Sequence, residues 1–162
     1  MLATVLAATS FSSFANWVSG ANYINISEDL AGQDLSFGIL AASVGYQFKA
    51  GDKFQLTPEL RLGTGIKDDT FSGVNVKINR FTSFSVRGEY DFSNDWYAYL
   101  APSYTNIKVK ASRSGVSATS DDWEFGFNTG IGLKATESTS VELVYEKYDD
   151  TDMLGASVKV QF

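Results

Sequence analysis

The chain has 162 residues, of which 44% are hydrophobic, and its formal net charge is −6. This length and composition predict one folded domain rather than a disordered chain, and the negative charge argues against a nucleic-acid-binding surface, which needs a basic stripe. The chain contains neither Cys nor His, which excludes disulfide bonds, thiolate metal sites and the most common catalytic base.

Residues 1–15 have the composition of a secretory signal peptide. They are uncharged, apolar in the first half and rich in small residues in the second, with Ser13 and Ala15 at the positions of a small-x-small cleavage site. We expect cleavage after Ala15 and a mature domain of residues 16–162. The alternative is a first buried strand or a short helix, since fifteen residues cannot span a bilayer as a helix.

The rest of the chain favours an all-β fold, because 14% of its residues are aromatic and it has 14 Gly but only 2 Pro. Eight strands are predicted, at residues 17–26, 35–48, 54–66, 74–92, 96–109, 123–135, 141–146 and 155–162. Apolar and polar residues alternate along them, so each strand has one apolar face. In the fourth strand this alternation assigns Val76, Ile78 and Val86 to the apolar face, and Arg80 and Phe81 interrupt it.

The connections between these strands differ in length at the two ends. Short turns are predicted at 50–53, 93–95 and 136–139, and longer polar loops at 27–34, 67–73, 110–122 and 149–152. No apolar run approaches the 18 residues or more of a transmembrane helix, so a membrane protein of this sequence would cross with strands. Short turns at one end and longer loops at the other are typical of outer-membrane barrels.

Charged residues lie in phase with the glycines and polar residues of the strands. They are Glu59, Arg61, Arg87, Glu89, Asp91, Glu124, Lys134, Glu142, Glu146 and Lys159. A carboxylate facing hydrocarbon is costly, so in a membrane barrel this face points into the lumen, where the charges can pair and fill the interior. We therefore predict a plugged lumen. A narrow ion path lined by Arg61, Arg87, Glu89, Glu142 and Glu146 is the alternative.

Aromatic residues gather beside the short turns. They are Tyr46, Phe48, Phe54, Tyr90, Phe92 and Trp96. Such rings favour the interface between water and lipid, which predicts an aromatic girdle on the periplasmic side.

The final strand ends in Val158-x-Val160-x-Phe162, with these three residues on its apolar face. Together with the signal-like leader and the eight alternating strands, this motif resembles the small outer-membrane β-barrel proteins, namely the opacity-like surface antigens and the transmembrane domains of outer-membrane proteins A and X. The resemblance covers residues 16–162. It implies an eight-stranded antiparallel up-and-down transmembrane β-barrel in the outer membrane of a Gram-negative bacterium. It also implies that Val158, Val160 and Phe162 are the signal read by the barrel assembly machinery.

The predicted function is non-enzymatic, because no nucleophile motif occurs and no His is present to activate a serine. We expect a monomer with a structural or surface-interaction role, such as adhesion or envelope integrity, in contact with membrane lipid and lipopolysaccharide and with a host surface ligand as a possible partner. No cofactor and no dedicated metal site are expected. The acidic loops lack the spaced pattern of a Ca²⁺ site, and we interpret them as a solvated rim, with divalent cation binding as the alternative. A different class of alternative is a soluble secreted lipocalin-like barrel, with its apolar faces inside around a ligand.

Overall fold

A computed structural model describes residues 16–30, 33–71, 74–113, 116–149 and 151–162. The predicted signal peptide, residues 1–15, lies outside the described residues. Among those that are described, no helix is long and apolar enough to cross a membrane. The strands are β1 (Trp17–Leu30), β2 (Gln33–Tyr46), β3 (Phe48–Lys49), β4 (Phe54–Lys67), β5 (Asp69–Phe71), β6 (Val74–Asp91), β7 (Trp96–Arg113), β8 (Val116–Lys134), β9 (Thr139–Tyr148) and β10 (Thr151–Gln161).

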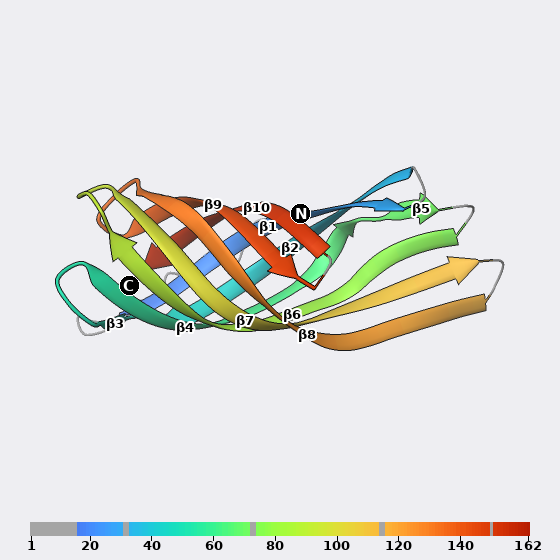
Figure 1. The fold of residues 1–162 in the computed structure, drawn as a ribbon, viewed down its shortest axis with the longest axis horizontal. Helices are drawn as coiled ribbons and strands as arrows, with labels where there is room; N and C mark the ends of the chain where they lie inside the picture. The colour runs from blue at the N-terminus through green and yellow to red at the C-terminus, as the bar shows by residue number, and fades with distance from the viewer. Residues whose placement is uncertain (1–15, 31–32, 72–73, 114–115, 150) are drawn as a thin grey trace.

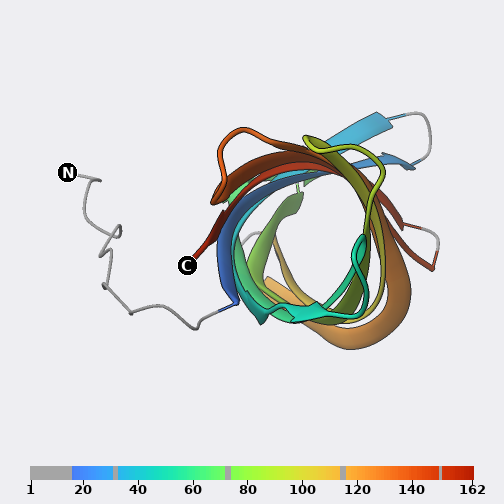
Figure 2. The ribbon, with the colours of Figure 1, turned by 90° about the vertical axis from the view of Figure 1, so that its left-hand side faces the viewer.

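The eight long strands close into one antiparallel barrel (Figure 2). Strands that follow one another along the chain pair with each other, and β1 pairs with β10 to complete the ring. The two short strands add to this ring, β3 beside β4 and β5 beside β6. The prediction of an all-β, eight-stranded up-and-down barrel is therefore confirmed.

The two ends of the barrel differ in length (Figure 1). At one end, here called the short-turn end, brief turns connect β3 to β4, β6 to β7 and β8 to β9. At the other, the hairpin end, long two-stranded hairpins extend beyond the ring. The predicted loops 27–34 and 110–122 are wrong, because pairing continues to Leu30↔Gln33 and to Arg113↔Val116. Polar residues there continue the ladder as well as apolar ones, because backbone groups make its hydrogen bonds.

Alternation along the strands orients their side chains as the sequence pattern predicts in the short-turn half. Val86 on β6 is 51% exposed on the outer surface, whereas its neighbours Ser85 and Arg87 are buried in the lumen. Closer to the hairpin end the prediction for Val76 and Ile78 is wrong. A bulge between Ile78 and Arg80 shifts the register against β7, so Ile78 is buried inside and Val76 packs against the same interior cluster.

The interior has two levels. Nearer the short-turn end it is polar and charged. Towards the hairpin end it is apolar, formed by a cluster of Ile24, Ile26, Phe37, Ile39, Ala41, Ile78, Phe81, Tyr148 and Met153. The polar level is the larger departure from the core of a soluble protein.

Candidate functional site

Arg61 and Glu146 form a bidentate ion pair in the lumen. Arg61 projects from β4 and Glu146 from β9, and the guanidinium donates to the two carboxylate oxygens at 2.6 and 2.8 Å. Arg61 also donates to the Ser83 hydroxyl at 3.1 Å, and the Tyr148 hydroxyl donates to Glu146 at 2.8 Å. Both charged groups are almost completely buried. A buried pair of this kind tolerates desolvation better when further hydrogen bonds satisfy its remaining groups. The Ser83 and Tyr148 hydroxyls supply two of them here, whereas the Arg61 Nε is buried without a hydrogen-bond partner.

A second cluster surrounds Arg87 on β6, one layer closer to the short-turn end. Its guanidinium contacts Glu142 through two nitrogens and donates to Glu89 at 3.0 Å. Glu142 accepts two further hydrogen bonds, each 2.6 Å long, from the hydroxyls of Tyr97 and Ser157. One arginine thus faces two carboxylates, and hydroxyl donors supply the rest of the coordination of Glu142.

The ring of Tyr99 lies against the Arg87 guanidinium, whose central carbon is 3.5 Å from the ring centroid. On the neighbouring strand β4, closer to the hairpin end, Arg61 lies 5.2 Å from the centroid of Phe81. Cation–π contacts of this type stabilise a desolvated guanidinium on the face that carries no hydrogen bond.

Two lysines complete the charged layer. Lys159 on β10 pairs with Glu59 on β4 and donates to Ser43 at 3.0 Å. Lys134 on β8 pairs with Asp91 at 2.7 Å, near the short turns. In the described part of the chain, the lumen therefore holds five ion pairs. Four of them link different strands, namely β4, β6, β8, β9 and β10, and the fifth, Arg87–Glu89, lies within β6.

Glycines on β8 make room for the tyrosines. A Cβ atom on Gly132 would overlap the ring of Tyr97, and one on Gly130 would lie 2.6 Å from the ring of Tyr99. Because these positions carry no side chain, both rings lie flat across the wall of β8 and reach Arg87 and Glu142. The charge pattern alone did not identify Tyr97, Tyr99, Tyr148 and Ser157 as partners of the lumen charges. The glycines on β8, at alternate positions of the inward face, were the signal in the sequence for the two tyrosines of β7.

Glu124 is the exception among the ten charged residues assigned to the lumen. The structure places it on β8 beyond the end of the β9–β10 hairpin, exposed, and not within the buried ionic clusters. Its phase was assigned correctly, since it lines the interior at the hairpin end. The prediction that Glu124 joins the lumen charge network is wrong, because the neighbouring strand β9 ends at the pair Gly126↔Tyr148, before it reaches the level of Glu124.

The charged layer leaves little open space. Between Arg61, Arg87 and Glu142 lies a gap of about 10 Å³, and a single water needs roughly 10–15 Å³. A larger cavity of about 220 Å³ lies at the short-turn end and a second, of about 290 Å³, at the hairpin end. The ionic clusters therefore separate two vestibules.

A charged cluster also lies on the outer surface of the β7–β8 hairpin. Asp121 accepts from the Asn106 amide at 2.7 Å, from Lys108 at 3.2 Å and from Arg80 at 3.3 Å. The hydrogen bond from Asn106, followed by that from Lys108, lowers the pKa of the Asp121 carboxyl below its ordinary value. Within the described residues, no group of three or more acidic side chains is arranged to hold a metal ion.

The six aromatic residues of the predicted girdle lie on the outer surface near the short-turn end, all of them exposed except the half-buried Tyr46. Trp17, which the sequence pattern did not assign, packs edge-on against Tyr46 with ring centroids 5.3 Å apart. Val158 and Phe162 are exposed on the same surface, and Val160 is half-buried. With Val86 and Phe127 also outside and the charges inside, a barrel with its apolar strand faces turned to the lumen is excluded.

Comparison with known proteins agrees with this geometry. Three solved structures each align over 91% of this chain and 98% of their own chain. Neisserial surface protein A is 14% identical with a TM-score of 0.67, and the attachment invasion locus protein Ail of Yersinia pestis is 10% identical with a TM-score of 0.66. The N-terminal β-barrel domain of Pseudomonas aeruginosa OprF is 13% identical with a TM-score of 0.57. At identities this low, the structural alignments show a shared fold and no more.

No curated protein sequence matches the chain. The family model described as the outer membrane protein beta-barrel domain matches residues 1–162. The chain therefore belongs to the outer membrane protein beta-barrel domain family, and its location is the outer membrane of a Gram-negative bacterium.

Proposed function

We propose that this protein is a non-enzymatic outer-membrane barrel with a closed lumen, whose role is structural or lies in contacts at the cell surface. The observation that carries the proposal is the buried ionic layer. Arg61–Glu146 and Arg87–Glu142 span the lumen, and the gap between them has room for about one water. A barrel closed in this way offers its outer hairpins for function rather than its interior.

A narrow ion path is the competing function, because the charged residues that fill the lumen could also line a channel. Planar-bilayer recordings of the purified protein test the two directly. We expect the intact protein to leave the membrane silent, and we expect Arg87→Ala with Glu142→Ala to give measurable conductance. Regular single-channel steps from the intact protein, unchanged by this double substitution, would overturn the closed-lumen proposal.

The surface role is supported by the hairpins that extend beyond the ring and by the relatives of this fold. The solved structures include Ail, an attachment invasion locus protein, and one of them contains Ail with the heparin analogue sucrose octasulfate. We propose that the hairpin end of this chain contacts a host surface ligand. We also propose that lysines of this end, such as Lys108, which pairs with Asp121, contact the phosphates of lipopolysaccharide.

A deletion strain complemented with the intact gene or with a shortened β7–β8 hairpin tests this role. We expect deletion to reduce adhesion to host cells or to raise detergent sensitivity, and the shortened hairpin to restore envelope integrity without adhesion. A deletion strain that is normal in both assays would contradict the proposal.

We further propose that the protein is a monomer, that Tyr46, Phe48, Phe54, Tyr90, Phe92 and Trp96 form its periplasmic girdle, and that Val158, Val160 and Phe162 are read by the barrel assembly machinery. The outward exposure of Val158 and Phe162 on β10 supports this assembly role. Replacing Phe162 with Ser is expected to lower the folded, heat-modifiable fraction in the outer membrane, while Phe92→Ser at the same end is not.

A further inference from the structure

The wall of the barrel is notched at the hairpin end. β9 and β10 stop at the pair Thr151↔Tyr148, whereas β7 and β8 remain paired up to Arg113↔Val116. Figure 1 shows β9 and β10 ending well short of the projecting β7–β8 hairpin. In the described register, β8 pairs with β9 only as far as Gly126, which leaves about 30 Å of β8 without a neighbour on that side.

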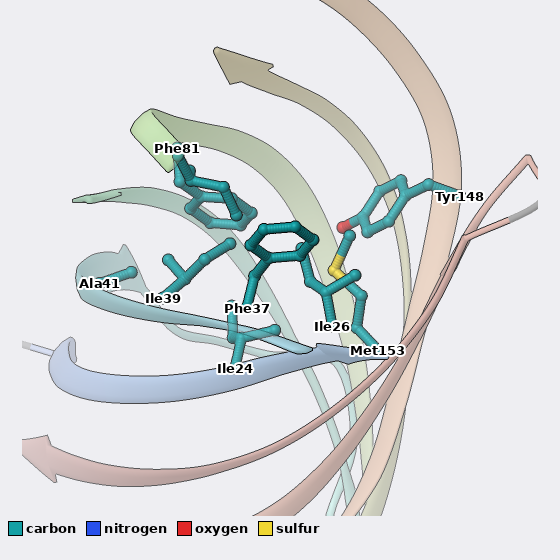
Figure 3. Packing of buried hydrophobic residues seen from close by; sticks show 9 residues of the cluster. Ile24, Ile26, Phe37, Ile39, Ala41, Phe81, Tyr148 and Met153 are labelled. Carbon is teal, nitrogen blue, oxygen red and sulfur yellow. The ribbon is translucent and has the colours of Figure 1, made fainter. Parts of the chain in front are cut away.

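Behind this notch lies the apolar level of the interior. Figure 3 shows Ile24, Ile26, Phe37 and Met153 converging on the same space as Phe81 and Tyr148. The adjoining cavity of about 290 Å³ is bounded by Ile26, Phe37, Ile78, Ile107, Val109 and Met153. Tyr148 lines it and donates to Glu146, so the floor of the cavity is the top of the ionic layer.

This cavity has the size and chemistry of a ligand site. An apolar cavity of roughly 150 Å³ stays dry and accepts benzene, and ligand pockets begin near 300 Å³. The wall of this space of about 290 Å³ is mainly apolar, and it also carries Thr105, Ser120 and Thr151, besides Asp122 and Glu124. Its apolar part therefore suits an alkyl chain, and its polar part suits the head group of an amphiphile. Phe125 and Leu154, the sequence neighbours of the lining residues Glu124 and Met153, are strongly exposed apolar residues on the outer surface.

The charges at the opening select the other end of such a ligand. Asp122 and Glu124 lie on the inward face of β8 and line the cavity, and its described lining includes no Lys or Arg. Arg80 and Lys108 from the same region are bound to Asp121 on the outer face. The mouth of the cavity is therefore anionic.

We propose that the cavity binds the alkyl chain of a single-chain amphiphile whose cationic head group lies beside Asp122 and Glu124 at the notch. This site is separate from the closed lumen and from any adhesive role of the hairpins, and it holds whether or not those proposals do. The ligand reaches the cavity either through the notch from the outer leaflet or from the external solution.

Met153 provides a reporter inside the cavity, since it is 1% exposed and the chain has only 2 Met. The full chain, labelled with ¹³C at the methionine methyl groups, is reconstituted in phosphatidylcholine nanodiscs and titrated with decyltrimethylammonium or with decanoate. We expect the cation to shift the Met153 methyl signal saturably, with magnetisation transfer from its alkyl chain, and decanoate to bind at least ten-fold more weakly. No saturable shift of Met153, or equal binding of both probes, would overturn the proposal.

Two variants separate the head-group site from general charge effects. Asp122→Asn with Glu124→Gln is expected to weaken binding of the cation about ten-fold and to remove the preference over decanoate. Asp68→Asn with Glu137→Gln makes the same change of charge at exposed positions outside the cavity lining and is expected to leave both unchanged. Equal effects of the two double variants would also overturn the proposal.

Spin-labelled phosphatidylcholine in the same nanodiscs distinguishes the two routes. Broadening of the Met153 signal beyond that of the outward-facing Leu154 methyl groups, labelled in a separate sample, indicates that chains enter from the leaflet. Saturable shifts that appear only with the added amphiphile indicate access from solution.

Discussion

Arg61 and Glu146 stand 85 positions apart in the chain and face each other across the lumen, joined by hydrogen bonds of 2.6 and 2.8 Å. Their side chains are 3% and 1% exposed. This pair lies where the polar level of the interior meets the apolar one, directly beneath the cavity at the hairpin end, because Tyr148 both donates to Glu146 and lines that cavity.

Removing one partner of this pair is expected to cost far more than removing both. Arg61→Met leaves the Glu146 carboxylate buried without its counter-charge, which costs about 3–5 kcal/mol in comparable buried pairs. Arg61→Met with Glu146→Leu is expected to recover most of that loss. The free energy of unfolding, from reversible urea titrations in lipid vesicles, measures both. A double variant as unstable as the single one would contradict a dominant role for the unpaired charge.

The outer surface is expected to reject charge in proportion to depth. Val86 and Phe48 are 51% and 52% exposed, the first in the middle of the apolar band and the second near the short turns. Arginine costs about 2–4 kcal/mol at the bilayer midplane and about 0–1 near its edge, so Val86→Arg is expected to destabilise the barrel much more than Phe48→Arg. The same urea titrations test this, and equal losses would place the membrane elsewhere on the barrel.

Gly126 is expected to tolerate no side chain. A Cβ atom there would overlap the backbone carbonyl of Lys147 and lie against the ring of Tyr148, neither of which can move without disturbing the β8–β9 ladder. Gly126→Ala should cost about 1–3 kcal/mol through overpacking. Gly51→Ala is the matched control, because a Cβ at Gly51 meets nothing within 4 Å. If both variants unfold at the same urea concentration, the close approach at Gly126 is not energetically important.

The outer part of the β7–β8 hairpin is expected to loosen in acid. Hydrogen bonds from Asn106 and Lys108 lower the pKa of the Asp121 carboxyl below its ordinary value of 3.8. The carboxylate therefore stabilises the folded hairpin at every pH above 3.8. The contribution disappears as the pH falls through the lowered pKa. Amide exchange on this hairpin is measured between pH 6 and pH 2, and each rate is divided by the rate of an unfolded peptide at the same pH. The resulting protection should fall with pH in the intact protein and stay constant in Asp121→Asn. An identical pH dependence in both would assign the effect to another group.

Much of the barrel could be predicted because a strand face is decided by alternation, and alternation is visible in the sequence. Val86 and Arg87 fall on opposite sides for this reason alone. Ile78 could not be placed in this way, since a single bulged residue reverses the phase of everything beyond it. Glu124 was misplaced for a different reason: alternation gives a residue's face but not the height at which the neighbouring strands end.

The apolar cavity was also not predictable. Ile24 and Ile26 on β1 point to the interior, yet the sequence pattern of this strand allowed either phase. Its phase is fixed by pairing with β2 and with β10, and β10 lies at the far end of the chain. Similarly, the tyrosines that surround Arg87 lie on β7 and depend on glycines of β8 for their space. Such relationships between strands become evident only when the register is known.

The link between Lys159 and Glu59 has a consequence for how the protein is made. These residues sit on β10 and β4, which are not neighbours in the sheet, so they meet only when the first and last strands have joined. Until then each charged group must stay hydrated. If β1 and β10 paired with their register shifted by one residue, one of the two groups would point towards the acyl chains. The ionic layer therefore destabilises barrels that close in the wrong register during biogenesis and stabilises the barrel that closes in the correct one.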